Sequence, residues 1–311
     1  MTSLRESADD YLRIRRALGY KLVNTGALLP RFVEYLEASG ADTVTTELAL
    51  AWATLPVATK PVYWQGRLTI ARGFARYLQT IDPRAEIPPT DALPAARGRP
   101  APYIYSDEDI DALMIAAGRL KTRLGAATMQ TLLGLLAVTG MRSGEAVRLD
   151  RDDVDLQHAR LIVRDSKFGK SRQLPVDPTT VAALRNYLQV RDRLKPSPRT
   201  SALLIGTRGE RLTRHYAEWA FRLLRERIGL KPRPGCGPPR LHDLRHTFAV
   251  RTILDSYRTD GDPQARLAAL STYLGHANPA ASYWYLSATP ELLALVAARL
   301  EQHLTDTETK R

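Results

Sequence analysis

Residues 159–176 read ARLIVRDSKFGKSRQLPV and contain the clearest change of pattern in the chain. The two outer runs, ARLIVRD and RQLPV, are short and rich in apolar residues, which is typical of strands. Between them, SKFGKS supplies a glycine suited to a hairpin turn and places Lys167 on or beside that turn. The stretch therefore predicts one small antiparallel sheet.

Helical spacing of apolar residues surrounds this predicted hairpin. Patterns of this kind cover residues 178–194 and 213–229 and resume after Leu241. Before the hairpin, Ser106 precedes three acidic residues as a helix N-cap would, and a helix over residues 128–138 ends at Gly140. Another helix begins around Ser143, so Arg142 lies at a helix junction. Residues 103–311 are predicted to form a mixed, mostly helical α+β domain.

The first part of the chain is predicted to be entirely helical. Helical patterns cover residues 8–18, 28–39, 46–53 and 63–80, with glycines and prolines between them. The segment that follows, IPPTDALPAARGRPAP at residues 87–102, contains five prolines and suits an extended linker. We therefore expect a helical domain over residues 1–86, and a fold that is mainly α.

Positive charge is concentrated after this linker. The chain has 45 Lys and Arg residues against 33 Asp and Glu residues, a net charge of +12. Residues 160–240 alone hold 19 basic and 6 acidic side chains. Such an excess indicates a polyanionic partner such as DNA, although a basic face can also serve only to keep a protein soluble.

Several other classes of protein are disfavoured. The single cysteine, Cys236, has no partner for an internal disulfide, and the six histidines show no spacing typical of a zinc site. No apolar run approaches the roughly 18 to 20 residues that cross a bilayer, and the N-terminus lacks a signal-peptide core. We expect a soluble, cytoplasmic protein that uses neither a metal nor another cofactor.

Six polar residues stand in short local patterns after the linker. Each alone has an ordinary structural explanation, such as an ion pair between Arg142 and Glu145, or a lysine in a turn. Together they form an ordered set: Arg142 in TGMRSGE, Lys167 in DSKFGKSR, His242 and Arg245 in LHDLRHTF, His276 in YLGHANP, and Tyr285 in SYWYLS.

This ordered set resembles the tyrosine recombinases of the phage-integrase and Xer-like family. The resemblance covers residues 103–300, and extends to the helical N-terminal part only through its layout. It implies a core-binding domain that contacts DNA, followed by a catalytic domain with a C-terminal helix. It also implies site-specific recombination, in which DNA strands are cut and rejoined through a 3′-phosphotyrosine and a Holliday junction.

The residue types suit that chemistry. Guanidinium groups such as Arg142 and Arg245 keep their charge and can bind the non-bridging oxygens of a phosphate under attack. By resemblance, Tyr285 is the nucleophile, Lys167 protonates the departing 5′ oxygen, and His242 handles protons near the nucleophile. His276 would donate a hydrogen bond to a phosphate oxygen. Glu145 is expected to orient the arginine pair rather than to transfer protons.

The choice of nucleophile depends on spacing. In the integrase pattern the tyrosine follows the LGH histidine by nine residues, which leads from His276 to Tyr285. Tyr283 is the second candidate, and Trp284 is interpreted as a packing residue.

One spacing departs from the simpler family members. Arg245 and His276 are 31 residues apart, instead of a number in the low twenties, and the extra length falls around residues 256–263, SYRTDGDP. That composition predicts a surface loop. The departure argues against a chromosome-dimer-resolving enzyme and favours a recombinase of a transposon or phage.

The last part of the chain is predicted to form a helix with an apolar face. After Pro290, apolar residues at helical spacing either pack on their own domain or, as the resemblance implies, on a neighbouring subunit in a tetramer on DNA; they are Leu292, Leu295, Val296, Leu300 and Leu304. A type IB topoisomerase would use much the same residues as a monomer. A non-catalytic DNA-binding protein would not need Tyr285 or Lys167.

Overall fold

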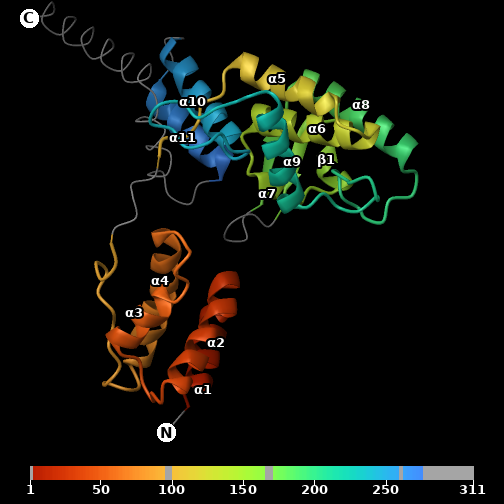
Figure 1. Ribbon diagram of the computed structural model, residues 1–311. Helices are drawn as coiled ribbons and strands as arrows, with labels where there is room; N and C mark the ends of the chain where they lie inside the picture. The colour runs from red at the N-terminus through yellow and green to blue at the C-terminus, as the bar shows by residue number, and fades with distance from the viewer. Residues whose placement is uncertain (1–2, 95–99, 165–170, 259–261, 276–311) are drawn as a thin grey trace, which may run out of the picture. The chain divides into compact units, whose positions relative to one another are not determined.

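The computed structural model describes residues 3–94, 100–164, 171–258 and 262–275. The chain divides into two compact units, unit 1 (Met1–Arg99) and unit 2 (Pro100–Arg311) (Figure 1). Lys167, His276 and Tyr285 lie outside the described residues, as do Tyr283, Trp284 and the predicted C-terminal helix.

Unit 1 is built from helices, as predicted. They are α1 (Leu4–Ala17), α2 (Val23–Ala38), α3 (Thr46–Thr54) and α4 (Pro61–Leu78). Their apolar faces meet in one core whose largest buried side chains are Leu29, Phe32, Leu36, Trp52, Leu68 and Phe74. Burial of these faces is the main stabilising contribution available to a small helical unit.

The first helix begins four residues earlier than the apolar pattern predicted. The Ser3 side chain accepts a hydrogen bond from the backbone N–H of Glu6, and the Glu6 carboxylate accepts one from the backbone N–H of Ser3. This reciprocal capping satisfies two N–H groups that have no partner inside the helix. The helix start is therefore set by a polar cap, which a search for apolar spacing overlooks.

The proline-rich segment after α4 lies along unit 1 in its first half. Arg72 donates hydrogen bonds to the carbonyl oxygens of Pro88 and Pro89, at 2.7 and 2.6 Å. Gln65 donates another to the carbonyl of Pro94, at 2.7 Å. Proline carbonyls suit this role because a proline-rich segment forms few backbone hydrogen bonds of its own.

Unit 2 is mostly helical, and its longest helices pack side by side. α6 (Arg123–Thr139) contacts α5 (Asp107–Gly118) and α8 (Pro178–Leu194), while α9 (Arg214–Arg227) packs on α5 and α10 (Asp243–Arg258) on α6. α11 (Pro263–Leu274) packs on α10 (Figure 1). The two short helices are α7 (Ser143–Ala146) and the 3-10 helix η1 (Arg151–Asp153).

The predicted hairpin is present as part of a small antiparallel sheet. β2 (Arg160–Val163) pairs with β3 (Arg172–Pro175), and Leu161 stands opposite Leu174. Both leucines are fully buried, because alternate side chains of these strands face the core of unit 2. A third strand, β1 (Val154–Asp155), pairs with β2 and was not predicted, because two residues are too few to show alternation. The mainly α fold with one small sheet is confirmed.

The region of extra length between Arg245 and His276 is more helical than predicted. α10 continues to Arg258, so the first residues of SYRTDGDP belong to the helix, and Ser256 is buried. The Ser256 hydroxyl donates to the carbonyl of Ile253, at 2.6 Å, which lets a polar residue sit inside the helix. Asp262 then caps α11 by accepting from the backbone N–H groups of Gln264 and Ala265.

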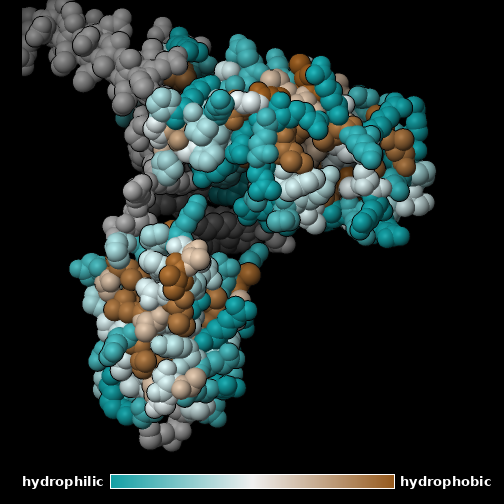
Figure 2. Space-filling view, in the orientation of Figure 1, coloured by the Kyte–Doolittle hydropathy of each residue, from teal (hydrophilic) through white to brown (hydrophobic). Residues whose placement is uncertain are grey.

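Hydrophilic residues cover much of the face of unit 2 that is seen in Figure 2. Within the described ranges, every helix is too short or too polar to cross a membrane.

Candidate active site

Two helix C-termini meet in unit 2, and Arg245 joins them. α6 ends at Gly140 and α11 ends at Gly275, each in the left-handed conformation, with φ of 57° and 68°. From α10, Arg245 Nη1 donates to the Gly140 carbonyl and Nη2 to the Leu274 carbonyl, both at 2.9 Å. Carbonyls at a helix C-terminus lack intrahelical partners and carry partial negative charge, so they suit a guanidinium.

Both glycines combine a left-handed conformation with close packing against a side chain. A Cβ on Gly140 would lie 2.4 Å from Cδ1 of Phe248, and a Cβ on Gly275 would lie 3.1 Å from Nη1 of Arg172. Other residues also adopt the left-handed conformation poorly. A larger residue would therefore strain the backbone at either helix end, and would displace the Phe248 ring at position 140 or crowd the Arg172 guanidinium at position 275.

Arg142 lies at the same place, between the two helix ends. It is the N-cap residue of α7, as the sequence predicted for a helix junction. Its Nη1 donates to Oε1 of Glu145 at 2.8 Å, and its Nη2 lies 3.4 Å from the carbonyl oxygen of Gly275. Arg245 binds the carbonyl of Leu274, the residue directly before Gly275. The structure therefore brings Arg142 and Arg245 together at the end of α11. The Arg142 side chain remains 28% exposed and can therefore meet a ligand.

Glu145 binds two arginines at once and is almost entirely buried. Besides Arg142, it accepts from Arg172, whose Nη2 lies 2.8 Å from Oε2 and whose Nη1 lies 3.2 Å from Oε1. Burial raises the pKa of Glu145, but hydrogen bonds from Arg172 and from the backbone N–H of Arg142 outweigh this effect and lower the pKa to about 2. The group is therefore a carboxylate at neutral pH, which suits a role in holding arginines.

His242 lies in the turn that leads into α10, three residues before Arg245. It directly precedes the helix, and the backbone N–H of Arg245 donates to its carbonyl at 3.1 Å, so the two residues share one turn. The His242 ring is half-buried, and it packs edge-on against the buried ring of His246, with 5.0 Å between centroids. His242 thus has a fixed position beside Arg245.

Three of the six residues singled out in the sequence are therefore described and lie close together. Lys167, His276 and Tyr285 fall outside the described residues. β3 begins with Arg172, which reaches the cluster, and the chain is last described at Gly275, which contacts Arg142 and directly precedes His276.

Arg172 is a member of the cluster that the sequence reasoning missed. Its Nε donates to the carbonyl of Tyr273 at 2.9 Å, in addition to its two bonds with Glu145. In the sequence it is only the first residue of a predicted strand, a position where arginine is usually exposed. Its partners are 27 and 101 residues away, and no local pattern signals such contacts.

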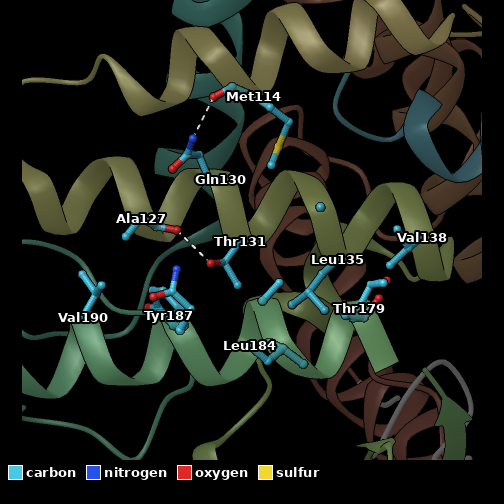
Figure 3. Close-up of a pocket in the computed structure, with 14 residues that line it drawn as sticks. Met114, Ala127, Gln130, Thr131, Leu135, Val138, Thr179, Leu184, Tyr187 and Val190 are labelled. Atoms are coloured by element: carbon cyan, nitrogen blue, oxygen red, sulfur yellow. Dashed lines mark hydrogen bonds between the residues drawn. The ribbon is translucent and has the colours of Figure 1, made fainter. Parts of the chain in front are cut away.

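An apolar groove of unit 2 has a different character. It lies between α5, α6 and α8, holds about 400 Å³, and has no charged side chain in its lining (Figure 3). Two of its polar side chains are used internally, since Gln130 donates to the carbonyl of Met114 and Thr131 to that of Ala127. This groove cannot stabilise a phosphate, whereas the arginine cluster can.

The cluster has the properties of an anion site for catalysis. Its guanidinium groups are held by carbonyls and by one carboxylate, so they need not reorganise when charge develops on a bound group. Arginine also keeps its charge at every physiological pH. Fixed charges of this kind stabilise a phosphate whose oxygens gain charge during attack by a nucleophile.

Two known proteins resemble the chain over most of its length. Integrase/recombinase y4rB of Sinorhizobium fredii is 41% identical over 312 residues, covering 98% of this chain and 99% of that protein. The tyrosine recombinase XerD of Mycobacterium tuberculosis is 34% identical over 220 residues, and the match covers 69% of this chain and 64% of that protein.

Solved structures show the same fold. The Tn1549 transposon integrase in complex with a circular intermediate DNA has a TM-score of 0.66 at 17% identity, and the match covers 94% of this chain and 99% of that one. XerH bound to its difH substrate has a TM-score of 0.64 at 20% identity, with coverage of 97% and 86%.

A family model agrees with these relatives and covers the region that contains the arginine cluster. It is described as the phage integrase family, and it matches residues 105–291. The chain therefore belongs to the phage integrase family of tyrosine recombinases, enzymes that cleave and rejoin DNA.

Proposed function

We propose that the chain performs site-specific recombination with Tyr285 as its nucleophile. The Tyr285 oxygen attacks a phosphorus atom of the DNA backbone, the bond to the 5′ oxygen breaks, and a 3′-phosphotyrosine forms. Attack by the 5′ hydroxyl of another strand reverses the step and rejoins the DNA, and paired exchanges pass through a Holliday junction. The observation that carries this proposal is the pairing of Arg142 and Arg245 at the two helix ends.

In this proposal, the arginines stabilise the transition state. Arg142 and Arg245 bind the non-bridging oxygens, which gain charge as the tyrosine oxygen approaches. Arg142 is the more accessible of the two, and Glu145 fixes its orientation. Because these groups supply the charge and the phosphotyrosine conserves the bond energy, the reaction needs neither a metal ion nor ATP.

The remaining three residues are assigned to proton transfer and to phosphate binding. Lys167 protonates the departing 5′ oxygen, His242 handles the proton of the nucleophile, and His276 donates a hydrogen bond to a phosphate oxygen. The position of His242 beside Arg245 supports its assignment, since a group on that turn can reach a phosphate held by the arginines.

The DNA is expected to lie against both units, and the active form to be a tetramer on two sites. Support comes from the basic excess of residues 160–240, and from α9, whose Arg214, His215 and Arg222 are exposed. Solved structures of this fold include a lambda integrase tetramer bound to a Holliday junction. A mobile element as the host of the gene, and a cytoplasmic location with reduced Cys236, fit the same proposal.

Covalent capture tests the proposed function. The protein is incubated with sheared, lightly nicked DNA of its source organism, because a nick beside the cleavage point releases the cut end and traps the intermediate. We expect a denaturation-resistant protein–DNA adduct, with a nucleotide on Tyr285 in mass spectrometry. Tyr285→Phe should abolish it, whereas the matched change Tyr283→Phe should leave it unaltered.

Controls separate the alternative functions. DNA binding without any adduct would indicate a non-catalytic DNA-binding protein, and relaxation of plasmid without strand exchange would indicate a topoisomerase. Adduct formation should persist in EDTA. If EDTA abolished it and magnesium restored it, a metal-dependent nuclease would replace the proposed mechanism.

A further inference from the structure

Arg172 connects three segments that are far apart in the sequence. It begins β3, it binds both oxygens of Glu145 next to the Arg142 segment, and it binds the carbonyl of Tyr273 at the end of α11. Its side chain is only 13% exposed. All three guanidinium nitrogens are thus engaged within the protein, which leaves little room for direct contact with a substrate.

We propose that Arg172 is a positioning residue that neutralises Glu145, so that the charge of Arg142 remains available to the scissile phosphate. This inference rests on the proposed function. It assigns to Arg172 an effect on cleavage that acts through Arg142, and not a contact with DNA.

The charges of the cluster support this assignment. One carboxylate lies between two guanidinium groups, with Nη–Oε distances of 2.8 Å to each arginine. If Arg172 were absent, the buried Glu145 would have Arg142 as its single described cationic partner, and the pair would be close to neutral. An arginine paired in this way attracts a phosphate less than one whose carboxylate partner is already neutralised.

The geometry of α11 adds a second, independent argument. The Arg172 guanidinium lies so close to Gly275 that a Cβ there would come within 3.1 to 3.5 Å of three of its atoms. The carbonyl of Gly275 accepts from Arg142, and the carbonyl of Tyr273, two residues earlier, accepts from Arg172. Arg172 therefore also fixes the backbone against which Arg142 rests.

The test compares Arg172→Met with Arg191→Met, on DNA isolated by covalent capture with the wild-type protein. Arg191 is the control, because its side chain is also largely shielded in unit 2, at 2% exposed against 13% for Arg172, and binds Asp192 and the Ala202 carbonyl, outside the cluster. We expect adduct formation by Arg172→Met to be about 100-fold slower, with DNA affinity changed less than threefold, and no comparable slowing in Arg191→Met. Arg172→Lys keeps the charge but not the geometry, so its rate of adduct formation should lie between those of the wild type and Arg172→Met.

Two further measurements distinguish positioning of charge from mere folding. The double variant Arg172→Met/Glu145→Gln should be about tenfold faster than Arg172→Met, since it removes the unneutralised carboxylate. On DNA whose scissile phosphate carries a methyl group in place of one charged oxygen, the defect of Arg172→Met should shrink at least tenfold. A purely structural role would give no recovery in either measurement.

The outcomes separate this inference from the proposed function. If the wild-type protein forms an adduct and Arg172→Met forms it equally fast, the assignment of Arg172 is wrong while the recombinase mechanism stands. A defect that is the same on charged and methylated DNA would also overturn it. If the wild-type protein forms no adduct at all, the proposed function itself fails. Thermal melting of each variant ensures that only folded protein is compared.

Discussion

The two units both bury arginines, but in different ways. In unit 1, Arg67 donates from Nε and Nη2 to one carbonyl, that of Trp52, and its guanidinium lies 3.8 Å above the Trp52 ring. In unit 2, Arg172 and Arg245 bind carbonyls at helix ends that come from distant parts of the chain. Arg67 fastens α4 to α3, whereas the arginines of unit 2 bind several segments together.

This difference indicates which arginines serve chemistry. A single arginine on an aromatic ring and one carbonyl is a local structural contact. Several arginines around one carboxylate and two helix ends concentrate positive charge, and folding tolerates this only because carbonyl oxygens and Glu145 compensate it. A bound phosphate can add to that compensation at Arg142, the partly exposed member. The same residue type is therefore structural at Arg67 in unit 1 and suited to catalysis in the arginine cluster of unit 2.

The largest effect is expected for Arg142→Ala. Loss of one preorganised charge contact typically costs about 3 kcal/mol or more of transition-state stabilisation, so the rate of adduct formation should fall at least about 100-fold. Affinity for DNA should change little, because many phosphate contacts contribute to it. Single-turnover trapping and a filter-binding assay measure the two quantities. A rate close to wild type would remove Arg142 from the proposed catalytic set.

The sequence allowed the position of Arg142 to be predicted, because the signals are local. A glycine after an apolar helical run predicts a left-handed cap, and Gly140 has that conformation. The hairpin of residues 160–175 was predictable for a similar reason, since strand-like runs flank a glycine-containing turn.

The contacts of Arg172 could not be predicted in this way. They depend on how α7, β3 and the end of α11 come together, which is decided by packing across the whole of unit 2. The role of Glu145 was expected in part, since its spacing from Arg142 suggested an ion pair, but its second partner was not. Local patterns thus identified separate elements of the site, and the tertiary fold determined how they are linked.

The next effect concerns acid stability and Glu145. The folded-state pKa of Glu145 is about 2, below the ordinary value of 4.5, so ionised Glu145 stabilises the fold above about pH 5. That contribution, up to about 3 kcal/mol, is lost as pH falls from about 5 to 2. Glu145→Gln has no such group, so its free energy of unfolding should fall less over this range. Urea unfolding at several pH values measures both proteins, and parallel curves would contradict the low pKa.

A smaller effect on stability alone is expected for Arg67→Met. The change removes two hydrogen bonds from a charged donor and the contact with the Trp52 ring, while methionine keeps part of the apolar packing. We expect unit 1 to lose about 2 kcal/mol of unfolding free energy. The rate of cleavage by DNA-bound, folded protein should remain within about twofold of wild type. A loss of rate like that of Arg142→Ala would contradict the distinction between the two units.

The smallest effect is expected for an exposed pair in unit 1. Arg5 binds Glu37 through Nε and Nη2 at 2.8 to 3.0 Å, so it uses two nitrogens, as Arg172 does with Glu145, but the Arg5 side chain is 64% exposed. Water and salt screen such a pair, and ordering two long side chains offsets most of the attraction. Arg5→Ala should therefore lower the melting temperature by no more than about 2 °C, and still less in 0.5 M salt.

Arg172→Met should lower the melting temperature clearly more, and this difference should persist in salt, because buried charges are poorly screened. Equal shifts for the two variants would mean that burial does not set the strength of the Arg172–Glu145 pair, which would weaken the case for Arg172 as the residue that controls the charge of Arg142.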